Sequence, residues 1–202
     1  MAGLRRLGVF GGTFDPPHIG HLILAAEACQ QLALTTVLWV LTPSPPHKRQ
    51  QVVSPQATRL LMLQAAIADA PLFQISRVDM DRPPPHYAID TVTILKAQYP
   101  DGEMVYLMGA DSLRDLPRWH RPRDFAAACN LVGVMRRPET HISLKGLEAE
   151  IPGITQKVQF IPAPRIEISS SNIRMRVGSG RPFRYFVPEG VYQIIQEMRL
   201  YR

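Results

Sequence analysis

Short, continuously apolar runs alternate along the chain with longer stretches in which apolar residues recur every three or four positions. The run Val37-Leu38-Trp39-Val40-Leu41 contains no polar residue, which is typical of a strand buried on both faces of a parallel sheet. On the same pattern we expect strands at residues 7–10, 37–41, 73–78, 104–108, 131–135 and 158–161.

The amphipathic stretches between these runs predict helices. We expect them at residues 18–32, from Ser54 onward, at 88–97, after Ser169-Ser170-Ser171, and from Pro188 onward. Ser54 is predicted to be the N-cap of the second helix, with Pro55 in its first helical position. The apolar residues of this helix and of the last one are Leu60, Leu61, Leu63 and Ile67, and Val191, Ile194, Ile195 and Met198.

Strands that alternate with helices predict a single α/β domain over residues 1–202. Its expected architecture is Rossmann-like: a doubly wound, mostly parallel sheet with helices on both faces and a short C-terminal helical segment. In such sheets ligands bind beyond the carboxyl ends of the strands. The turns after Phe10, Leu41, Met108 and Met135 should therefore face one cleft.

Composition excludes several classes of protein. Of the 202 residues, 46% are hydrophobic, which is typical of a globular chain rather than a disordered one. Only Cys29 and Cys129 are present, so no disulfide framework is implied and a cytoplasmic location is expected. The sequence has no signal-peptide pattern and no window close to the ~20 apolar residues of a membrane helix.

The net charge of +6 is concentrated in one segment. Residues 165–184 hold five arginines against Glu167, which accounts for +4. Composition alone fits either a nucleic-acid surface or a small phosphorylated ligand. The charge lies around Ser169 to Arg174, and both interpretations stay open on this ground alone.

The first turn carries the strongest chemical signal. It reads Gly11-Gly12-Thr13-Phe14-Asp15-Pro16-Pro17-His18-Ile19-Gly20-His21. Glycines after a buried strand let backbone amides approach a ligand, and the N-terminus of the next helix favours an anion. His18 and His21 are three residues apart, so both rings can project from one helical face toward a phosphate. The alternative for each histidine is a surface or capping residue.

Other known fingerprints are absent. A zinc site would need a third ligand, and neither HExxH nor a cysteine cluster occurs. The spacing is not the GxGxxG of dinucleotide-binding proteins, and GxxxxGK[ST] is missing.

Further polar residues follow later strands. Asp111, after Gly109, could accept a hydrogen bond from a ribose hydroxyl, or simply cap a helix. Ser169 to Ser171 with Arg174 could hold phosphates, or form an ordinary serine cap with a solvated arginine. His47 and Lys48 could bind a second phosphate. Trp119 offers a flat face to a ring or is a packing residue, and Arg137 lies near the cleft or in solvent.

These motifs together resemble a known family. His18-Ile19-Gly20-His21 is similar to the HxGH signature of a nucleotidyltransferase superfamily, and the longer GGTFDPPHIGH resembles its bacterial nicotinate-nucleotide adenylyltransferases. Four more segments match that family's motifs in order: Pro45-Pro46-His47-Lys48, Tyr87-Ala88-Ile89-Asp90-Thr91, Gly109-Ala110-Asp111-Ser112-Leu113 and Ile168-Ser169-Ser170-Ser171-Asn172-Ile173-Arg174.

The resemblance implies transfer of the adenylyl group of ATP to nicotinate mononucleotide, giving deamido-NAD and pyrophosphate. It implies that His18, His21 and Arg174 are catalytic. The implied ATP-binding residues are Gly11, Gly12, Thr13, Phe14, Gly20, Gly109, Asp111, Ile168, Ser169, Ser170 and Ser171. The implied nicotinate-nucleotide-binding residues are His47, Lys48, Tyr87, Ala88, Thr91, Asp111, Trp119 and Arg137.

The same resemblance implies that Mg²⁺ arrives with the ATP phosphates, with no dedicated protein ligands. The expected partners are ATP and nicotinate mononucleotide, with no nucleic acid and no membrane; a homo-oligomer is left open. On this resemblance the +4 charge around Ser169 to Arg174 is expected to surround the triphosphate. The chain departs from the family at His86-Tyr87-Ala88, where Ser-Tyr-Thr is usual, and at the proline triplet 83–85. Alternative substrates are nicotinamide mononucleotide and phosphopantetheine, and the alternative class is a nucleotide-binding module without turnover.

Overall fold

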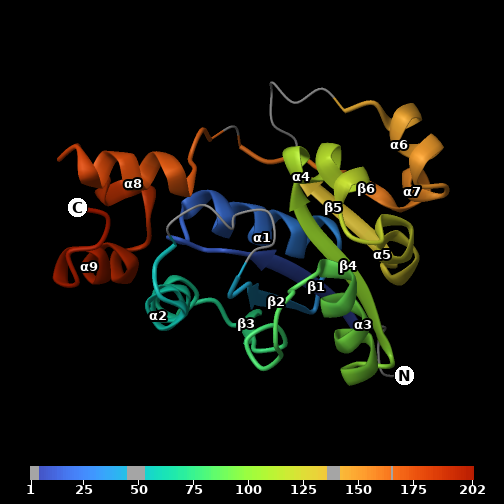
Figure 1. Ribbon diagram of the computed structural model, residues 1–202, viewed down its shortest axis with the longest axis horizontal. Coiled ribbons are helices and arrows are strands. Elements are labelled where there is room, and N and C mark those ends of the chain that lie inside the picture. Colours follow the sequence, from blue (N-terminus) through green and yellow to red (C-terminus); the bar gives the residue numbers. More distant parts are fainter. Residues whose placement is uncertain (1–4, 45–52, 136–141, 165) are drawn as a thin grey trace.

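A computed structural model describes residues 5–44, 53–135, 142–164 and 166–202. In these residues one six-stranded sheet has the order β3-β2-β1-β4-β5-β6, and all its neighbouring strands are parallel (Figure 1). The strands are β1 (Arg5–Gly12), β2 (Thr36–Leu41), β3 (Phe73–Ser76), β4 (Gly102–Gly109), β5 (Leu131–Met135) and β6 (Val158–Ile161). Each lies where an apolar run predicted it, and the predicted parallel sheet is confirmed.

The direction of strand succession reverses between β1 and β4. Val9 of β1 pairs with Leu38 of β2 on one side and with Tyr106 of β4 on the other. The carboxyl ends of β1 and β4 therefore lie side by side at the topological switch point, where ligands bind in sheets of this kind. This register confirms that the carboxyl ends of β1, β2, β4 and β5 share one edge of the sheet.

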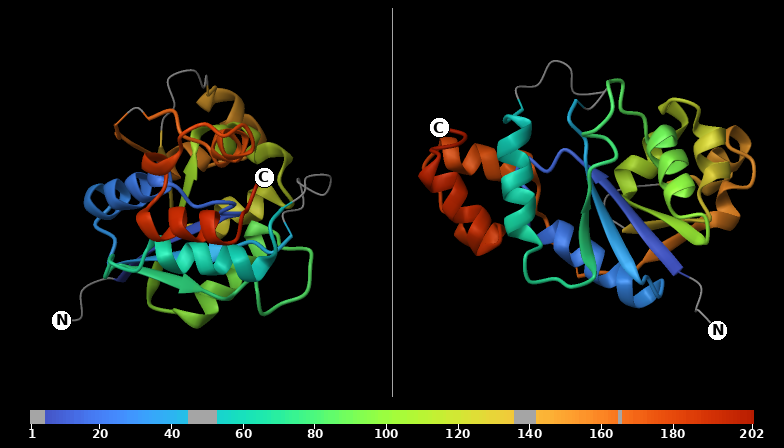
Figure 2. Two further views of the ribbon diagram at one scale, coloured as in Figure 1. Left: turned by 90° about the vertical axis from the view of Figure 1, so that its left-hand side faces the viewer. Right: turned by 90° about the horizontal axis from the view of Figure 1, so that it is seen from below.

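Helices cover both faces of the sheet, as predicted. In the described residues they are α1 (Ile19–Gln31), α2 (Gln56–Ala66), α3 (Ala88–Gln98), α4 (Ala110–Asp115), α5 (Pro122–Ala128), α6 (Leu144–Glu150), α7 (Ile154–Lys157), α8 (Ser170–Gly178) and α9 (Glu189–Glu197), with short 3₁₀ turns η2 (Leu116–Arg118) and η3 (Arg184–Phe186). Residues of α1, α2, α8 and α9 join one buried cluster, and residues of α3 to α7 join the other. Figure 2 shows α2, α8 and α9 gathered on one side of the molecule and α5 to α7 on the opposite side.

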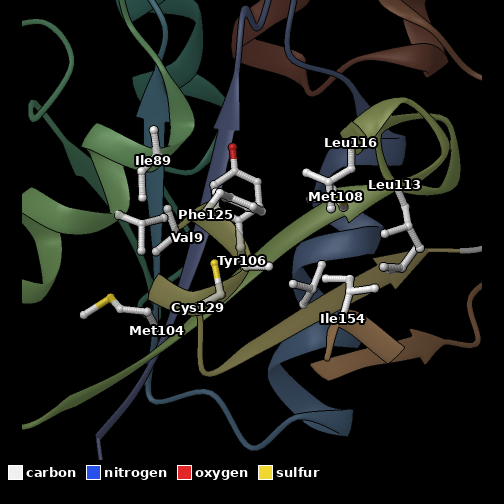
Figure 3. Close-up of a cluster of buried hydrophobic side chains, with 14 of the residues drawn as sticks. Val9, Ile89, Met104, Tyr106, Met108, Leu113, Leu116, Phe125, Cys129 and Ile154 are labelled. Carbon is white, nitrogen blue, oxygen red and sulfur yellow. The ribbon is translucent and has the colours of Figure 1, made fainter. Parts of the chain in front are cut away.

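Alternate residues of the strands supply the two clusters. Val9 and Tyr106 face α3, α4 and α5, whereas Phe10 and Trp39 face α1 and α2. Figure 3 shows the cluster that α3 to α7 join, in which the Tyr106 ring lies beside Phe125. The two rings meet edge to face, with centroids 4.9 Å apart. Tyr106 therefore anchors the centre of the sheet close to the ligand-binding edge.

The start of α2 differs from the prediction. Pro55, not Ser54, is the N-cap, and the helix begins at Gln56. The reason is that Ser54 is held by other partners: its N–H donates to a carboxylate oxygen of Asp15, and its carbonyl accepts from Arg59. Ser54 thus joins α2 to the first turn instead of capping the helix.

Both cysteines are free thiols, as expected. Burial raises the pKa of the Cys129 thiol to about 12, and it lies within the cluster of Figure 3. In the described part of the chain, no helix has the length and apolar character needed to cross a membrane.

Two leucines of α2 test the burial pattern. Leu63 is fully buried in the cluster that residues of α1, α8 and α9 also join, whereas Leu61 is 46% exposed on the same helix. Leu63→Ala should lower the free energy of unfolding by about 2–5 kcal/mol, because it leaves a cavity in a close-packed core. Leu61→Ala, the matched control, should lower it by less than about 1 kcal/mol. Urea unfolding followed by circular dichroism measures both, and equal losses would contradict the packing of α2.

Candidate functional site

Two glycines end β1 where the first turn packs tightly. A β-carbon on Gly11 would lie 2.9 Å from the Tyr106 hydroxyl, and one on Gly12 would lie 2.8 Å from the Phe14 ring. A larger residue at position 11 would therefore displace the Tyr106 hydroxyl of β4, and one at position 12 would displace the Phe14 ring. The predicted role of these glycines, a close backbone approach at the sheet edge, agrees with this geometry.

His18 and His21 form a stacked pair at the N-terminus of α1. Their ring centroids are 3.6 Å apart, with 23° between the planes. The prediction that both rings lie on one face is confirmed. The backbone N–H of His18 donates to Nδ1 of His21 over 3.1 Å. Because this nitrogen accepts a hydrogen bond, a neutral His21 carries its proton on Nε2 and can donate it to an anion.

The residues around the pair hold it in place. Gly20 is needed because a β-carbon there would lie 3.2 Å from the His18 ring. Phe14 is buried with a positive φ of 48°, and its ring meets His21 edge to face at 5.2 Å. The Phe14 ring therefore packs against His21. Because this ring is buried, only the backbone of Phe14 is available for the predicted contact with ATP.

The start of α8 is joined directly to the first turn. Ser169 caps the helix by accepting from the N–H of Asn172, so for this serine the alternative of an ordinary helix cap is confirmed. The Ser170 hydroxyl donates to the carbonyl of Pro16 over 2.9 Å. Arg174 donates to the carbonyl of Asp15 over 2.7 Å and to the Ser171 hydroxyl over 3.3 Å. The structure thus brings together the HxGH and serine–arginine motifs that sequence reasoning assigned to the triphosphate.

Ile168, also assigned to ATP, lies against Gly20, since its β-carbon is 3.9 Å from where a β-carbon of Gly20 would be. It therefore continues the contact between the start of α8 and the start of α1. Thr13 belongs to the same turn and is held through its carbonyl, which accepts from Arg59 over 3.0 Å.

The turn after β4 lies open beside the first turn. No atom comes within 4 Å of the position a β-carbon of Gly109 would take. Gly109 is itself the N-cap of α4, so the alternative of Asp111 as the cap is wrong. Asp111 lies in the first turn of α4 and forms an ion pair with Arg114 at 3.6 Å. The ion pair is solvent-exposed, so this carboxylate can also meet a ligand at the cleft edge.

The residues predicted to bind the nicotinate nucleotide, Tyr87, Ala88 and Trp119, form a second group. Tyr106 lies between this group and the turn after β1. Tyr87 is the N-cap of α3, Ala88 is its first residue, and the Tyr87 ring stacks on His120 with centroids 4.0 Å apart. Trp119 is half-buried and packs on Phe125 and Tyr106, with centroid distances of 5.3 Å and 6.1 Å. Tyr106 touches both this group and Gly11, and so connects the two halves of the site.

Thr91 differs from its predicted role as a ligand contact. Its side chain is buried, and its hydroxyl donates to the Asp79 carboxylate over 2.7 Å. Arg82 pairs with the same carboxylate at 2.9 Å and also donates to the carbonyl of Tyr87. The hydroxyl of Thr91 is thus used to hold the loop before α3. His86, the departure from the family pattern, is buried in this loop, with Nε2 3.2 Å from the Arg82 carbonyl.

The arginines of the basic segment, residues 165–184, were expected to gather around one phosphate site. Among its described arginines, Arg174 contacts the first turn, whereas Arg181 and Arg184 line a cavity of about 590 Å³ at the other end of α8. Arg176 donates to Asn172 and to the carbonyl of Pro182. The expectation that the whole +4 surrounds one phosphate site is therefore wrong.

Three predicted residues, His47, Lys48 and Arg137, lie outside the described residues. Their assignment to the nicotinate nucleotide stays a prediction.

Sequence reasoning missed a buried arginine that organises the site. Arg59 is only 2% exposed and donates to four carbonyls, those of Thr13, Thr42, Pro43 and Ser54. Burial lowers the pKa of Arg59, while the nearby Asp15 carboxylate raises it. The only signal in the sequence was an arginine amid the apolar residues of a predicted helix.

Sequence reasoning also gave no separate role to Asp15 or Tyr201. Asp15 is 3% exposed and accepts a hydrogen bond of 2.6 Å from the Tyr201 hydroxyl. Asp15 stood inside the first motif, but nothing in the sequence connected it with a residue 186 positions away.

Comparison with known proteins identifies the family of this chain. Residues 9–176 match the cytidylyltransferase-like family. A probable nicotinate-nucleotide adenylyltransferase of Thermomicrobium roseum is 46% identical over 98% of this chain and 92% of its own length. A protein of the same description from Saccharopolyspora erythraea is 41% identical over 100% of this chain and 92% of its own length.

Solved structures share the fold. The nicotinic acid mononucleotide adenylyltransferase of Plasmodium falciparum, complexed with NaAD, superposes with a TM-score of 0.80 over 98% of this chain and 97% of its own, at 16% identity. Its complex with APC gives a TM-score of 0.78 over the same shares, also at 16% identity. On its sequence relatives, the chain belongs to the cytidylyltransferase-like family and, within it, to the nicotinate-nucleotide adenylyltransferases.

Proposed function

We propose that this chain transfers the adenylyl group of ATP to nicotinate mononucleotide, giving deamido-NAD and pyrophosphate, a step of NAD biosynthesis. The observation that carries the proposal is the joining of the stacked His18–His21 pair to the start of α8, through Ser170 and Arg174, at the switch point of the sheet. Relatives named for this activity match nearly the whole chain.

The reaction is a direct displacement at phosphorus. A phosphate oxygen of nicotinate mononucleotide forms a bond to the α-phosphorus of ATP while the bond from that phosphorus to the bridging oxygen breaks. Pyrophosphate leaves with the electron pair of the broken bond. Because the attacking phosphate is already ionised at neutral pH, no general base is required, and catalysis consists of positioning and charge stabilisation.

The residues of the first turn and α8 divide this work. Nε2 of His21 and the ring of His18 donate to the α-phosphate oxygens, at the positive end of the α1 dipole. Arg174 and the Ser169 to Ser171 segment neutralise charge on the departing β- and γ-phosphates. Mg²⁺ enters with ATP as part of the substrate and is held by phosphate oxygens and water.

The remaining contacts follow the two halves of the site. Gly109 and Asp111 are proposed to meet the adenosine. Tyr87, Ala88 and Trp119 are proposed to meet the nicotinate ring and its carboxylate, and His47, Lys48 and Arg137 its phosphate. The backbone amides at the start of α3 are donors, and they favour a carboxylate over the NH₂ of a carboxamide. We propose that the protein acts in the cytoplasm.

His18 tests the catalytic site. His18→Ala should lower kcat by roughly 10²–10³-fold, the usual loss when one preorganised donor to a developing charge is removed. Gln30→Ala, at an exposed position of the same helix, is the control and should leave kcat unchanged. Pyrophosphate release from ATP and nicotinate mononucleotide measures both. A His18→Ala enzyme that keeps wild-type turnover would refute the catalytic role.

The second substrate tests specificity. The acid should have a kcat/KM roughly 10- to 100-fold higher than nicotinamide mononucleotide, because a carboxamide NH₂ would leave backbone donors unpaired. The two nucleotides are compared in the same pyrophosphate assay, with phosphopantetheine as a third acceptor. Equal rates with acid and amide would contradict the specificity, and turnover of phosphopantetheine alone would place the chain with the other adenylyltransferases.

A further inference from the structure

The segment after α9 folds back onto the first turn. Arg199 and Tyr201 both have positive φ angles, 50° and 63°, which turn the chain toward the core. The Tyr201 ring joins the cluster beneath α1, α2, α8 and α9, and its hydroxyl lies 3.8 Å from the Met62 sulfur of α2. A β-carbon on Gly178, the last residue of α8, would lie 3.2 Å from the Tyr201 carbonyl. Tyr201 is therefore wedged between α2 and the end of α8.

From this place Tyr201 reaches the catalytic turn. Its hydroxyl donates to Oδ1 of Asp15 over 2.6 Å, and Oδ2 of Asp15 accepts from the Ser54 N–H over 3.1 Å. A carboxylate buried to this degree requires such partners, because an unpaired buried charge is strongly unfavourable. Burial, and then the Asp15 carboxylate itself, raise the pKa of Tyr201 above its ordinary value, so the phenol stays a donor at neutral pH.

Asp15 connects this contact with the reacting groups. Its own carbonyl accepts the 2.7 Å hydrogen bond from Arg174, the residue assigned to the departing phosphates. Two prolines, Pro16 and Pro17, separate it from His18, and their fixed φ angles make the intervening backbone stiff. A change in the orientation of the Asp15 peptide would therefore change the positions of both Arg174 and the His18–His21 pair.

We propose that Tyr201 is a positioning residue for adenylyl transfer: its hydroxyl fixes Asp15, and Asp15 sets the orientation of Arg174 and the turn that presents His18. The role rests on the proposed function, and it acts on the triphosphate half of the site. Tyr87 and Trp119 lie in the other half, across Tyr106, so binding of the nicotinate nucleotide should be independent of Tyr201.

Tyr201→Phe tests the proposal, because it removes only the hydroxyl and keeps the ring. We expect kcat to fall roughly 10-fold, since small misplacements of reacting groups cost up to about 10²-fold. The KM for nicotinate mononucleotide should stay unchanged. Tyr185→Phe is the matched control, because Tyr185 is 87% exposed in the same C-terminal segment, and it should have wild-type kinetics.

A double-mutant cycle separates positioning from general stability. Asp15→Ala should reproduce the loss of kcat, because it removes the acceptor of the Tyr201 hydroxyl. Adding Tyr201→Phe to it should cause little further loss, because both changes break the same contact. Assays run at a temperature where circular dichroism shows each variant folded. Unchanged kcat in Tyr201→Phe, independent multiplicative losses in the double variant, or an equal rise in the KM of both substrates would each overturn the proposal.

The wild-type enzyme supplies the separate test of the proposed function. Formation of deamido-NAD by the wild type supports that function, whatever Tyr201→Phe does. If the wild type forms none, the function is wrong, and affinity for a non-hydrolysable ATP analogue still tests Tyr201. In that case weaker binding in Tyr201→Phe, with Tyr185→Phe unchanged, supports the positioning role, and equal binding overturns it.

Discussion

The buried guanidinium of Arg59 is the interaction on which the cleft depends. The chain leaves the sheet at the carboxyl ends of β1 and β2. The carbonyl groups of the turns that follow have no neighbouring strand to pair with and need other hydrogen-bond donors. Unpaired buried carbonyls are costly, and a single arginine with five N–H donors can satisfy several at once. Arg59 does so for the turns after both strands and for the approach to α2. The positive charge is in turn offset by Asp15, which the same turn supplies.

Around this core the site has two halves that meet at Tyr106. One half is built from the starts of α1 and α8, and it is the half that we propose binds the phosphates of ATP. The other is built from the starts of α3 and α5 and gathers aromatic rings, with Tyr87, His120 and Trp119 beside Phe125. The Tyr106 hydroxyl lies beside Gly11, and the Tyr106 ring lies beside Trp119. One buried residue of the central strand β4 therefore separates the two halves.

The sequence was sufficient for the parts of this arrangement that depend on local pattern. Continuous apolar runs identified the parallel strands, and the glycines and histidines after β1 indicated the helix start that faces the ligand. The contacts it did not reveal are made with residues outside the local pattern that supported each prediction. Ser54 would cap α2 on local preference, but Asp15 and Arg59 take its backbone groups. Thr91 lies within a motif that was assigned to ligand binding, yet its hydroxyl donates to the buried carboxylate of Asp79, in the loop before α3. Arg174, Arg181 and Arg184 are close in sequence but divide between the two ends of α8.

The hydrogen bonds from Ser170 and Arg174 to the first turn also bear on how the active site assembles. They join residues more than 150 positions apart, so they form only after the intervening strands and helices have closed the chain on itself. On the ribosome, the HxGH turn emerges early and must wait for α8 and the segment after α9 before it reaches its final shape. A partly synthesised chain can therefore contain the complete histidine motif and still be unable to hold a triphosphate.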